Sequence, residues 1–374
     1  MGTDLEQRLC EAKARRDWDG YLRLLGGSTE LFLDMKKTRA DADPDSVWFL
    51  TQRDWLRRKY LVVRTRGELP PRRPDLVVTG CTLDWLLDSW PEGVDRLLVN
   101  PGTPSQALFR GGRRRREHYR RTAASVPRPD GCPDQLLTLH AGPRQGPLAH
   151  GLACGAHLAV HQGVLWNDIG DVYDDYTCDV KGLRDDWGTT DHTTWQRQLT
   201  FLLRGQNTSR RVEFVLDVRR EAAREHGGPI DEDTWRKRLT AALAESDLAE
   251  DWAQRLVSRT LAYEERFRAD GLLPEGGFVR TALGYDYGRA VGFARWGVGA
   301  RYAEPAEAEK AILRAGALCQ ERYRSWEDFS AGYTLGRVLR FDEDTFGHYY
   351  EGALEPHRAL TRDPASPWRT IPFR

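Results

Sequence analysis

The sequence of 374 residues lacks the long apolar runs that a membrane-spanning protein needs. It contains no stretch of 18 apolar residues, and its N-terminal segment MGTDLEQRLC carries charges where a signal peptide would have an apolar core. Its six cysteines include no C-x-x-C pair, which argues against a zinc site and against a secreted disulfide framework. We therefore expect a cytoplasmic protein with reduced thiols and no membrane association.

The sequence also lacks the short motifs of two common enzyme classes. Neither G-x-x-x-x-G-K-[ST] nor G-x-S-x-G occurs, which disfavours nucleotide hydrolysis by a P-loop and serine hydrolase chemistry. Lysine is scarce as well, because only seven of the 56 basic residues are lysine. This preference for arginine over lysine pervades the chain, so abundant arginine is weak evidence for nucleic-acid binding. The 56 acidic residues balance the basic ones, so the whole chain offers no net attraction to nucleic acid or membrane.

The residues that are present are typical of a globular protein. The chain is 40% hydrophobic and 30% charged, which supplies a core without a broad disorder signature. Its length exceeds what one hydrophobic core usually supports, so we expect two domains. We predict an α+β protein, in which residues 1–110 form a small α/β domain with a short-stranded sheet and residues 136–374 form a larger, mainly helical domain.

Short apolar runs in the first 110 residues predict the strands. These runs are rich in Val and Leu and bounded by Pro, Gly or Asp. They are ELFLDM (30–35), SVWFLT (46–51), KYLVVRT (59–65), PDLVVTG (74–80) and DRLLVNP (95–101). Between the last two lies CTLDWLLDSWPEG, whose leucines share one side and predict a short crossover helix.

The same residues carry a family resemblance. VWFLTQRDWL, followed by DLVVTGCTLDWLLDSWPEGVDRLLVNPGTPSQALF with its turn at Asn100-Pro101-Gly102, resembles the SseB N-terminal domain over about residues 17–110. The resemblance implies a small α/β module that lacks a known catalytic site and is often regarded as an interaction domain.

An arginine-rich segment follows, RGGRRRREHYRR, with seven arginines in residues 110–121. Like charges at this density repel one another, so we predict that residues 111–135 are an extended, solvated linker. The alternative is an anionic-partner patch made of Arg113, Arg114, Arg115 and Arg116, which would bind nucleic acid, phosphate or an acidic protein.

Helical signals dominate after residue 136. Asp191 and Asp231 are placed as N-caps, Gly271 as a C-terminal stop, and Glu304-Pro305 as a helix start. VEFVLDV (212–218) is ambiguous, and we favour a helix there. We expect the terminal SPWRTIPF to dock through its tryptophan against the helical domain.

A second resemblance covers about residues 148–372. The stretch from 285 to 337 is similar to the bacterial domain-of-unknown-function family numbered 1266. The matching positions are Asp286, Arg289, Arg295-Trp296, Glu307, Ser325-Trp326 and Gly336-Arg337. The resemblance implies a helical domain whose activity is not established.

Two stripes of this region mix aromatic and charged side chains. Asp286, Arg289, Phe293 and Trp296 recur at helical spacing, and so do Trp326, Phe329, Tyr333 and Arg337, after a predicted N-cap at Ser325. A buried guanidinium needs a carboxylate, so we predict that Arg337 pairs with Asp286 and fixes the register of two helices.

The alternative interpretation is a ligand-binding site for a carboxylate or phosphate, since two arginines and one aspartate leave a positive charge unpaired. Its predicted members are Asp286, Arg289, Trp296, Trp326, Tyr333 and Arg337. No catalytic residue is assigned.

We predict no metal site and no cofactor. His157 and His161 stand four apart, but no H-E-x-x-H signature accompanies them, and apolar neighbours favour core or edge histidines. The aspartates of NDIGDVYDDYTCD (167–179) match no EF-hand spacing, which favours a solvated acidic turn.

These observations favour a non-catalytic cytoplasmic binding or adaptor protein that recognises a protein partner, of the immunity or effector-associated kind. The wealth of aromatic residues, 13 Trp and 13 Tyr, could supply interface anchors. One alternative is an enzyme or receptor for an anionic small molecule at the Asp286, Arg289 and Arg337 cluster. Nucleic-acid binding through residues 110–121 is the least favoured.

Overall fold

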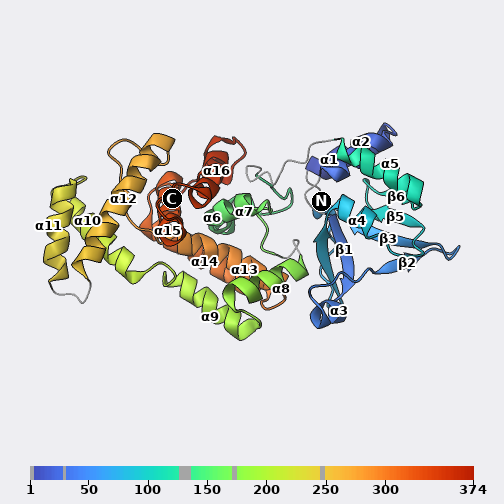
Figure 1. Cartoon of the computed structure of the whole chain (residues 1–374), viewed down its shortest axis with the longest axis horizontal. Coiled ribbons are helices and arrows are strands. Elements are labelled where there is room, and N and C mark those ends of the chain that lie inside the picture. Colours follow the sequence, from blue (N-terminus) through green and yellow to red (C-terminus); the bar gives the residue numbers. More distant parts are fainter. Residues whose placement is uncertain (1–3, 28–30, 126–135, 171–174, 245–248) are drawn as a thin grey trace.

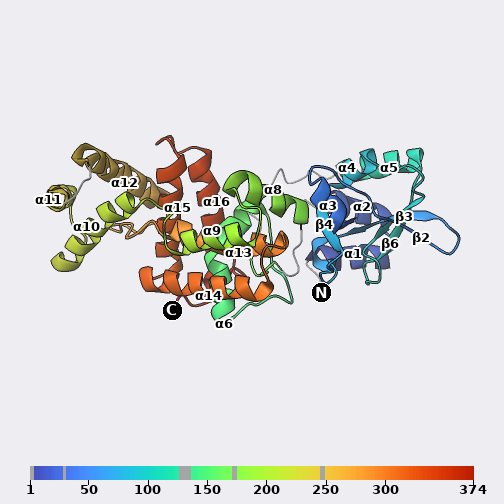
Figure 2. The same ribbon diagram turned by 90° about the horizontal axis from the view of Figure 1, so that it is seen from below.

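The computed structural model describes residues 4–27, 31–125, 136–170, 175–244 and 249–374. It shows an α+β protein, in which a sheet region is followed by a larger helical region (Figure 1). The predicted fold class is therefore confirmed. The molecule is elongated, with the sheet at one end and helices α10 to α12 at the other, as the second view also shows (Figure 2).

A six-stranded sheet forms the N-terminal region. Its strands are β1 (Leu31–Lys36), β2 (Thr51–Arg53), β3 (Lys59–Arg64), β4 (Leu76–Cys81), β5 (Arg96–Val99) and β6 (Ala107–Arg110). The order is β4-β1-β3-β5-β6, and β2 pairs with β3. Only β3 and β5 run parallel among the described pairs. Their connection passes through β4 and the short helix α4 (Leu83–Asp88), which confirms the predicted crossover helix and has Thr82 as its N-cap.

Helices supply the other half of the N-terminal core. They are α1 (Asp4–Ala14), α2 (Trp18–Gly26), α3 (Lys37–Ala42), the 3-10 turn η1 (Arg66–Glu68), α4 and α5 (Arg113–Ala124). Buried residues of α1, α2, α4 and α5 share one apolar cluster with Leu33, Val63 and Val99 of the sheet. Burial of that cluster stabilises the region in the usual way, by removing apolar surface from water.

The prediction of an extended linker at 111–135 is wrong for residues 113–124, which form α5. Tyr119 and Ala123 lie on one face of this helix and are buried, and Ala123 packs directly on Gly26 of α2. Burial of this face outweighs repulsion among the arginines, most of which project from the exposed side. Residues 126–135 lie outside the described part of the chain.

Two strand predictions also need correction. Residues 47–50 form no strand, and β2 covers only 51–53. Val47 and Phe49 instead pack on the core from an irregular segment, so their apolar character reports burial without sheet pairing. Strand β6, which pairs with β5, was not predicted.

The second region consists of helices. They are α6 (Gly146–Cys154), α7 (Ala156–Gln162), α8 (Tyr176–Trp187), α9 (His192–Leu203), α10 (Arg210–His226), α11 (Glu232–Leu243), α12 (Glu250–Asp270), α13 (Gly284–Gly299), α14 (Pro305–Arg322), α15 (Trp326–Phe341), α16 (His348–Arg362) and α17 (Pro367–Thr370). The predicted caps of α9, α11, α12 and α14 are confirmed, and the ambiguous segment 212–218 is helical.

Helix α13 is the centre of this region. It packs against α6, α7, α8, α9, α14 and α15, and nearly all of its residues are buried. Gly288 allows a close approach, because a Cβ there would lie 2.9 Å from both the Cys154 carbonyl oxygen and the Tyr333 ring. At the C-terminus, Trp368 stacks on Trp326 and donates a hydrogen bond to the Ala153 carbonyl, which confirms the docking of the tail.

The two regions touch mainly through β4 and α8. Arg301, just after α13, donates hydrogen bonds of 3.1 Å to the carbonyls of Arg73 and Leu76, and the Tyr176 hydroxyl donates one of 2.5 Å to Asp41. No helix in the described part of the chain combines the length and apolar character that crossing a bilayer requires. The five described cysteines are free thiols.

Candidate functional site

The predicted pair of Asp286 and Arg337 does not form. Asp286, on α13, is fully buried and accepts hydrogen bonds from the loop between α9 and α10. The Asn207 and Thr208 backbone N–H groups donate at 2.9 Å and the Thr208 hydroxyl at 2.7 Å. Burial raises the pKa of Asp286, although these donors favour the carboxylate. Asp286 is thus a structural acceptor that holds this loop on α13.

Arg337, on α15, meets a different set of groups. Its Nε donates to the Tyr349 carbonyl at 3.0 Å, and its Nη2 lies 3.4 Å from Nε2 of His161. The side chain is half-buried and ties α15 to α7 and α16. The helical period in the sequence correctly predicted which face of α15 carries Arg337. It does not show which neighbouring helix packs against that face.

Arg289 lies between aromatic rings. Its guanidinium is 4.3 Å from the ring centroid of Trp187 and 5.2 Å from that of Tyr285, and its Nη1 donates to the Tyr285 hydroxyl at 2.5 Å. These are favourable cation-π contacts. Tyr285 in turn contacts Tyr333 edge to face at 5.3 Å. The structure therefore brings Arg289, Tyr333 and Arg337 into one seam between α13 and α15.

The tryptophans of the predicted site belong to the packed core. Trp326 donates its indole N–H to the Ile371 carbonyl at 2.9 Å, and Tyr333 stacks on His157 at 4.3 Å. Trp296 lines a cavity of only about 10 Å³, which is smaller than a ligand needs. The six predicted residues do not converge on one open pocket, and the seam is filled with side chains.

A buried serine between two histidines was not predicted. The Ser330 hydroxyl lies 3.0 Å from Nε2 of His157 and 2.9 Å from Nδ1 of His357, which links α7, α15 and α16. Burial lowers the pKa of His157 well below its usual value and that of His357 to about 4. Both imidazoles are therefore neutral at pH 7. Among the described residues, no group of three His, Cys, Asp or Glu side chains is placed to hold a metal ion.

A buried arginine that pairs with a carboxylate and joins two helices, as expected of Arg337, is found at another position. Arg219 of α10 donates to Glu264 of α12 at 2.7 Å, and both side chains are buried. Its guanidinium lies 4.4 Å from the Trp235 ring centroid and 4.7 Å from that of Phe278. The signal in the sequence was that Arg219 and Glu264 each fall on the apolar face of a helix. No sequence motif marks this pair.

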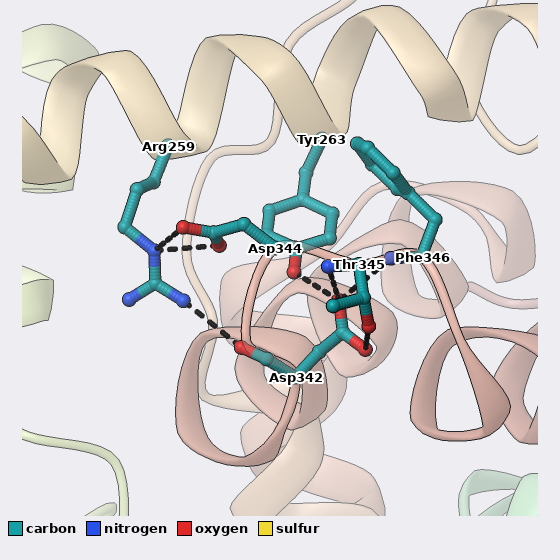
Figure 3. A network of polar contacts seen from close by, with 6 residues as sticks. All are labelled: Arg259, Tyr263, Asp342, Asp344, Thr345 and Phe346. Atoms are coloured by element: carbon teal, nitrogen blue, oxygen red, sulfur yellow. Dashed lines mark hydrogen bonds and ion pairs between the residues drawn. The ribbon is translucent and has the colours of Figure 1, made fainter.

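A second buried aspartate organises the loop after α15 (Figure 3). Asp342 accepts hydrogen bonds from the Tyr263 hydroxyl at 2.5 Å and from the backbone N–H groups of Thr345 and Phe346 at 3.1 Å. Beside it, Arg259 of α12 holds Asp344 at 2.7 Å. Like Asp286, Asp342 lies at a junction of elements and stabilises a loop.

Comparison with known families places these helices in a wider group. The family described as Protein of unknown function (DUF1266) matches residues 182–373, which is just over half of the chain. The chain belongs to the DUF1266 family. No curated protein and no solved structure matches it. The DUF1266 match includes Asp286, Arg289, Arg219, Glu264 and Ser330, whereas His157 and His161 precede it.

The predicted arginine patch lies outside the DUF1266 match, on α5. Arg113, Arg114 and Arg115 are exposed, whereas Arg116 donates to the Leu87 carbonyl at 3.1 Å and lies 5.5 Å from the Trp90 ring centroid. Three of the four arginines thus face water. A solvated helix face explains them as well as a binding patch does.

The hairpin of β2 and β3 carries Trp55, the most exposed large apolar residue of the described chain, and next to it the exposed Leu56. Trp55 is 87% exposed and Leu56 48% exposed at its tip. Asp54 fixes the turn, because its carboxylate accepts from the Arg58 backbone N–H at 2.9 Å and from the Arg58 Nε at 2.7 Å. Arg57 adopts a left-handed conformation with φ of 59°. The turn is therefore ordered, and it holds Trp55 and Leu56 in water.

Proposed function

We propose that this DUF1266 protein is a non-catalytic binding or adaptor protein, and that the hairpin tip of its N-terminal domain recognises a protein partner. The main support for this proposal is the exposure of Trp55 on a turn that Asp54 and Arg58 hold in place. Exposure of a tryptophan forgoes the stabilisation that its burial would give. A partner that covers the ring on binding would recover that stabilisation.

The chemistry of the tip suggests what the partner offers. Tryptophan and arginine are the residue types that dominate binding energy at protein interfaces. The exposed Arg53 and Arg57 flank Trp55 and Leu56, whereas the single acid of the turn, Asp54, is already paired with Arg58. The complementary surface is an apolar pocket for Trp55 with acidic side chains at its rim.

The resemblance to the SseB N-terminal domain supports the same proposal. That resemblance implies an interaction module, and the hairpin lies inside the region that carries it. A bacterial cytoplasmic adaptor of the immunity or effector-associated kind is the form of this function that we favour.

The test is affinity capture with the full chain from cells of its source, with mass spectrometry of the captured proteins. We expect one stoichiometric protein partner, lost or weakened at least tenfold by Trp55→Ser. Leu108→Ser is the matched control, because Leu108 is 49% exposed on β6, away from the hairpin. Capture that is empty, or that Trp55→Ser leaves unchanged, rejects the proposal.

A further inference from the structure

A large cavity lies in the DUF1266 region, away from the seam of Arg289 and Arg337. Its volume is about 1140 Å³, and it opens between the end of α10, the loop that follows α12 and the start of α15. Four arginines line it, Arg220, Arg224, Arg280 and Arg324. We call it the arginine cavity. Small-molecule sites usually occupy 300 to 1,000 Å³, so this volume accommodates more than a simple ion.

Two of these arginines interact with Asp328 only at longer range. The guanidinium groups of Arg280 and Arg324 make no hydrogen bond or ion pair with any residue in the described ranges. Arg220, by contrast, pairs with Asp217 at 2.6 Å and donates to the Arg280 carbonyl at 3.2 Å. Arg280 is half-buried, and the nearby Asp328 carboxylate offsets only part of the cost of desolvating its charge, because burial still lowers the pKa of Arg280.

The arginines also repel one another. Burial lowers the pKa of Arg280, and the positive charges of Arg324 and Arg220 lower it further, while the Asp328 carboxylate opposes this shift without reversing it. Three acids line the cavity as well, Glu221, Glu327 and Asp328, which leaves an excess of one positive charge (four arginines less three acids). The Asp328 carboxylate already accepts the Arg324 backbone N–H at 2.9 Å. A ligand that brings negative charge would relieve this repulsion.

Apolar residues form another part of the wall. Leu272, Leu273 and Phe278 line the cavity beside the arginines. The first turn of α15, capped by Ser325, also borders it, and the positive end of that helix dipole favours an anion. Charged and apolar walls together suit a ligand with an anionic head and an apolar body.

We infer that the arginine cavity binds an organic anion, with its phosphate or carboxylate head on Arg280 and Arg324 and its apolar body against Leu272, Leu273 and Phe278. Arginine forks bind both head groups in a bidentate manner. This site is distinct from the hairpin tip, so the protein would recognise a small anion and a macromolecular partner on separate surfaces.

Isothermal titration calorimetry of the full chain tests this inference. The probes are phenyl phosphate and benzoate, which share an apolar ring and differ in the anionic head, and benzyl alcohol, which has no charge. We expect saturable binding of at least one anion at a stoichiometry of one, and no measurable binding of the alcohol. The anion that binds more tightly identifies the head group.

Matched substitutions connect the binding to the cavity. Arg280→Ala and Arg324→Ala should each weaken the anion at least tenfold, and Arg255→Ala, which removes an exposed arginine of α12 outside the cavity, should change nothing. Neither cavity variant loses a hydrogen bond, so each should melt at the parent temperature or above it. Three results overturn the inference: no binding of either anion, equal binding of the alcohol, or anion binding that persists in the cavity variants.

Discussion

At the scale of single residues, the clearest contrast is between Asp286 and Arg337. Asp286 is fully buried and receives hydrogen bonds from two successive residues, so its loss would strand several donors. Arg337 is half-buried and donates one short hydrogen bond to a carbonyl. Water can replace that contact, whereas it cannot easily reach the donors around Asp286.

We therefore predict that Asp286→Ala lowers the free energy of unfolding by about 3 to 4 kcal/mol and that Arg337→Met lowers it by about 1 kcal/mol. Urea unfolding measures both changes. The double variant should show the sum of the two effects, because the side chains share no contact. A coupling energy above roughly 1 kcal/mol would indicate that Asp286 and Arg337 form a direct ion pair, as the sequence suggested.

At the scale of elements, the Ser330 hydroxyl and its two histidines join three helices. His157 faces Arg337 and His161, which disfavour its protonation, and His357 faces Glu327 together with Arg358 and Arg362. Burial is the main reason that both pKa values are lowered. The folded protein thus keeps neutral imidazoles where the unfolded chain, with ordinary histidines near pH 6.5, takes up protons.

The sign of the pH dependence follows from this difference. Stability is complete above about pH 6.5 and falls as the pH drops towards 4, because the unfolded state binds more protons in that window. For His357 alone the loss reaches about 2 kcal/mol at pH 5. Urea unfolding at pH 7.5 and pH 5.0 measures it.

Other groups also titrate between pH 7.5 and 5.0, so the comparison must be between variants. His357→Gln should reduce the loss of stability, while His118→Gln, which replaces a histidine with an exposed side chain, should leave it unchanged. An unchanged pH dependence in His357→Gln would mean that His357 is not held neutral in the fold.

At the scale of the whole molecule, the two regions are joined by a small set of contacts. Tyr176 packs with Met35 and Val77 and bonds to Asp41, while Arg301 bonds to backbone carbonyls of the N-terminal region. The Thr79 and Thr177 hydroxyls also lie 2.5 Å apart, Lys181 pairs with Asp45 at 2.7 Å, and Arg72 donates to the Val298 carbonyl. Each region has its own large apolar cluster. Interfaces of this kind permit relative motion of domains once their few contacts are removed.

We predict that the combined variant Arg72→Ala, Tyr176→Ala, Lys181→Ala, Arg301→Ala separates the regions without unfolding either one. Its radius of gyration in small-angle X-ray scattering should increase, while its far-ultraviolet circular dichroism stays that of the parent. If the radius does not change, contacts other than these hold the two regions together.

The sequence alone determined the features that depend on neighbouring residues. N-caps at Asp191, Asp231 and Ser325, and the glycine that ends α12, were predictable because a helix end is decided within one turn of chain. The α+β class and the helical nature of the DUF1266 region followed from the same local periods. The arginine run of α5 was mispredicted, since the face formed by Tyr119 and Ala123 gains its stability only from α2.

Only the tertiary structure decided which distant groups meet. A helical period says that Arg337 or Arg219 lies on a packed face, but the partner depends on which helix the fold lays against that face. The fold assigned Glu264 to Arg219 and a carbonyl to Arg337, and it left Arg280 and Arg324 together without a partner among the described residues. Charge pairing acts through space over a few ångströms, and for these groups that proximity is set by packing and not by position in the chain.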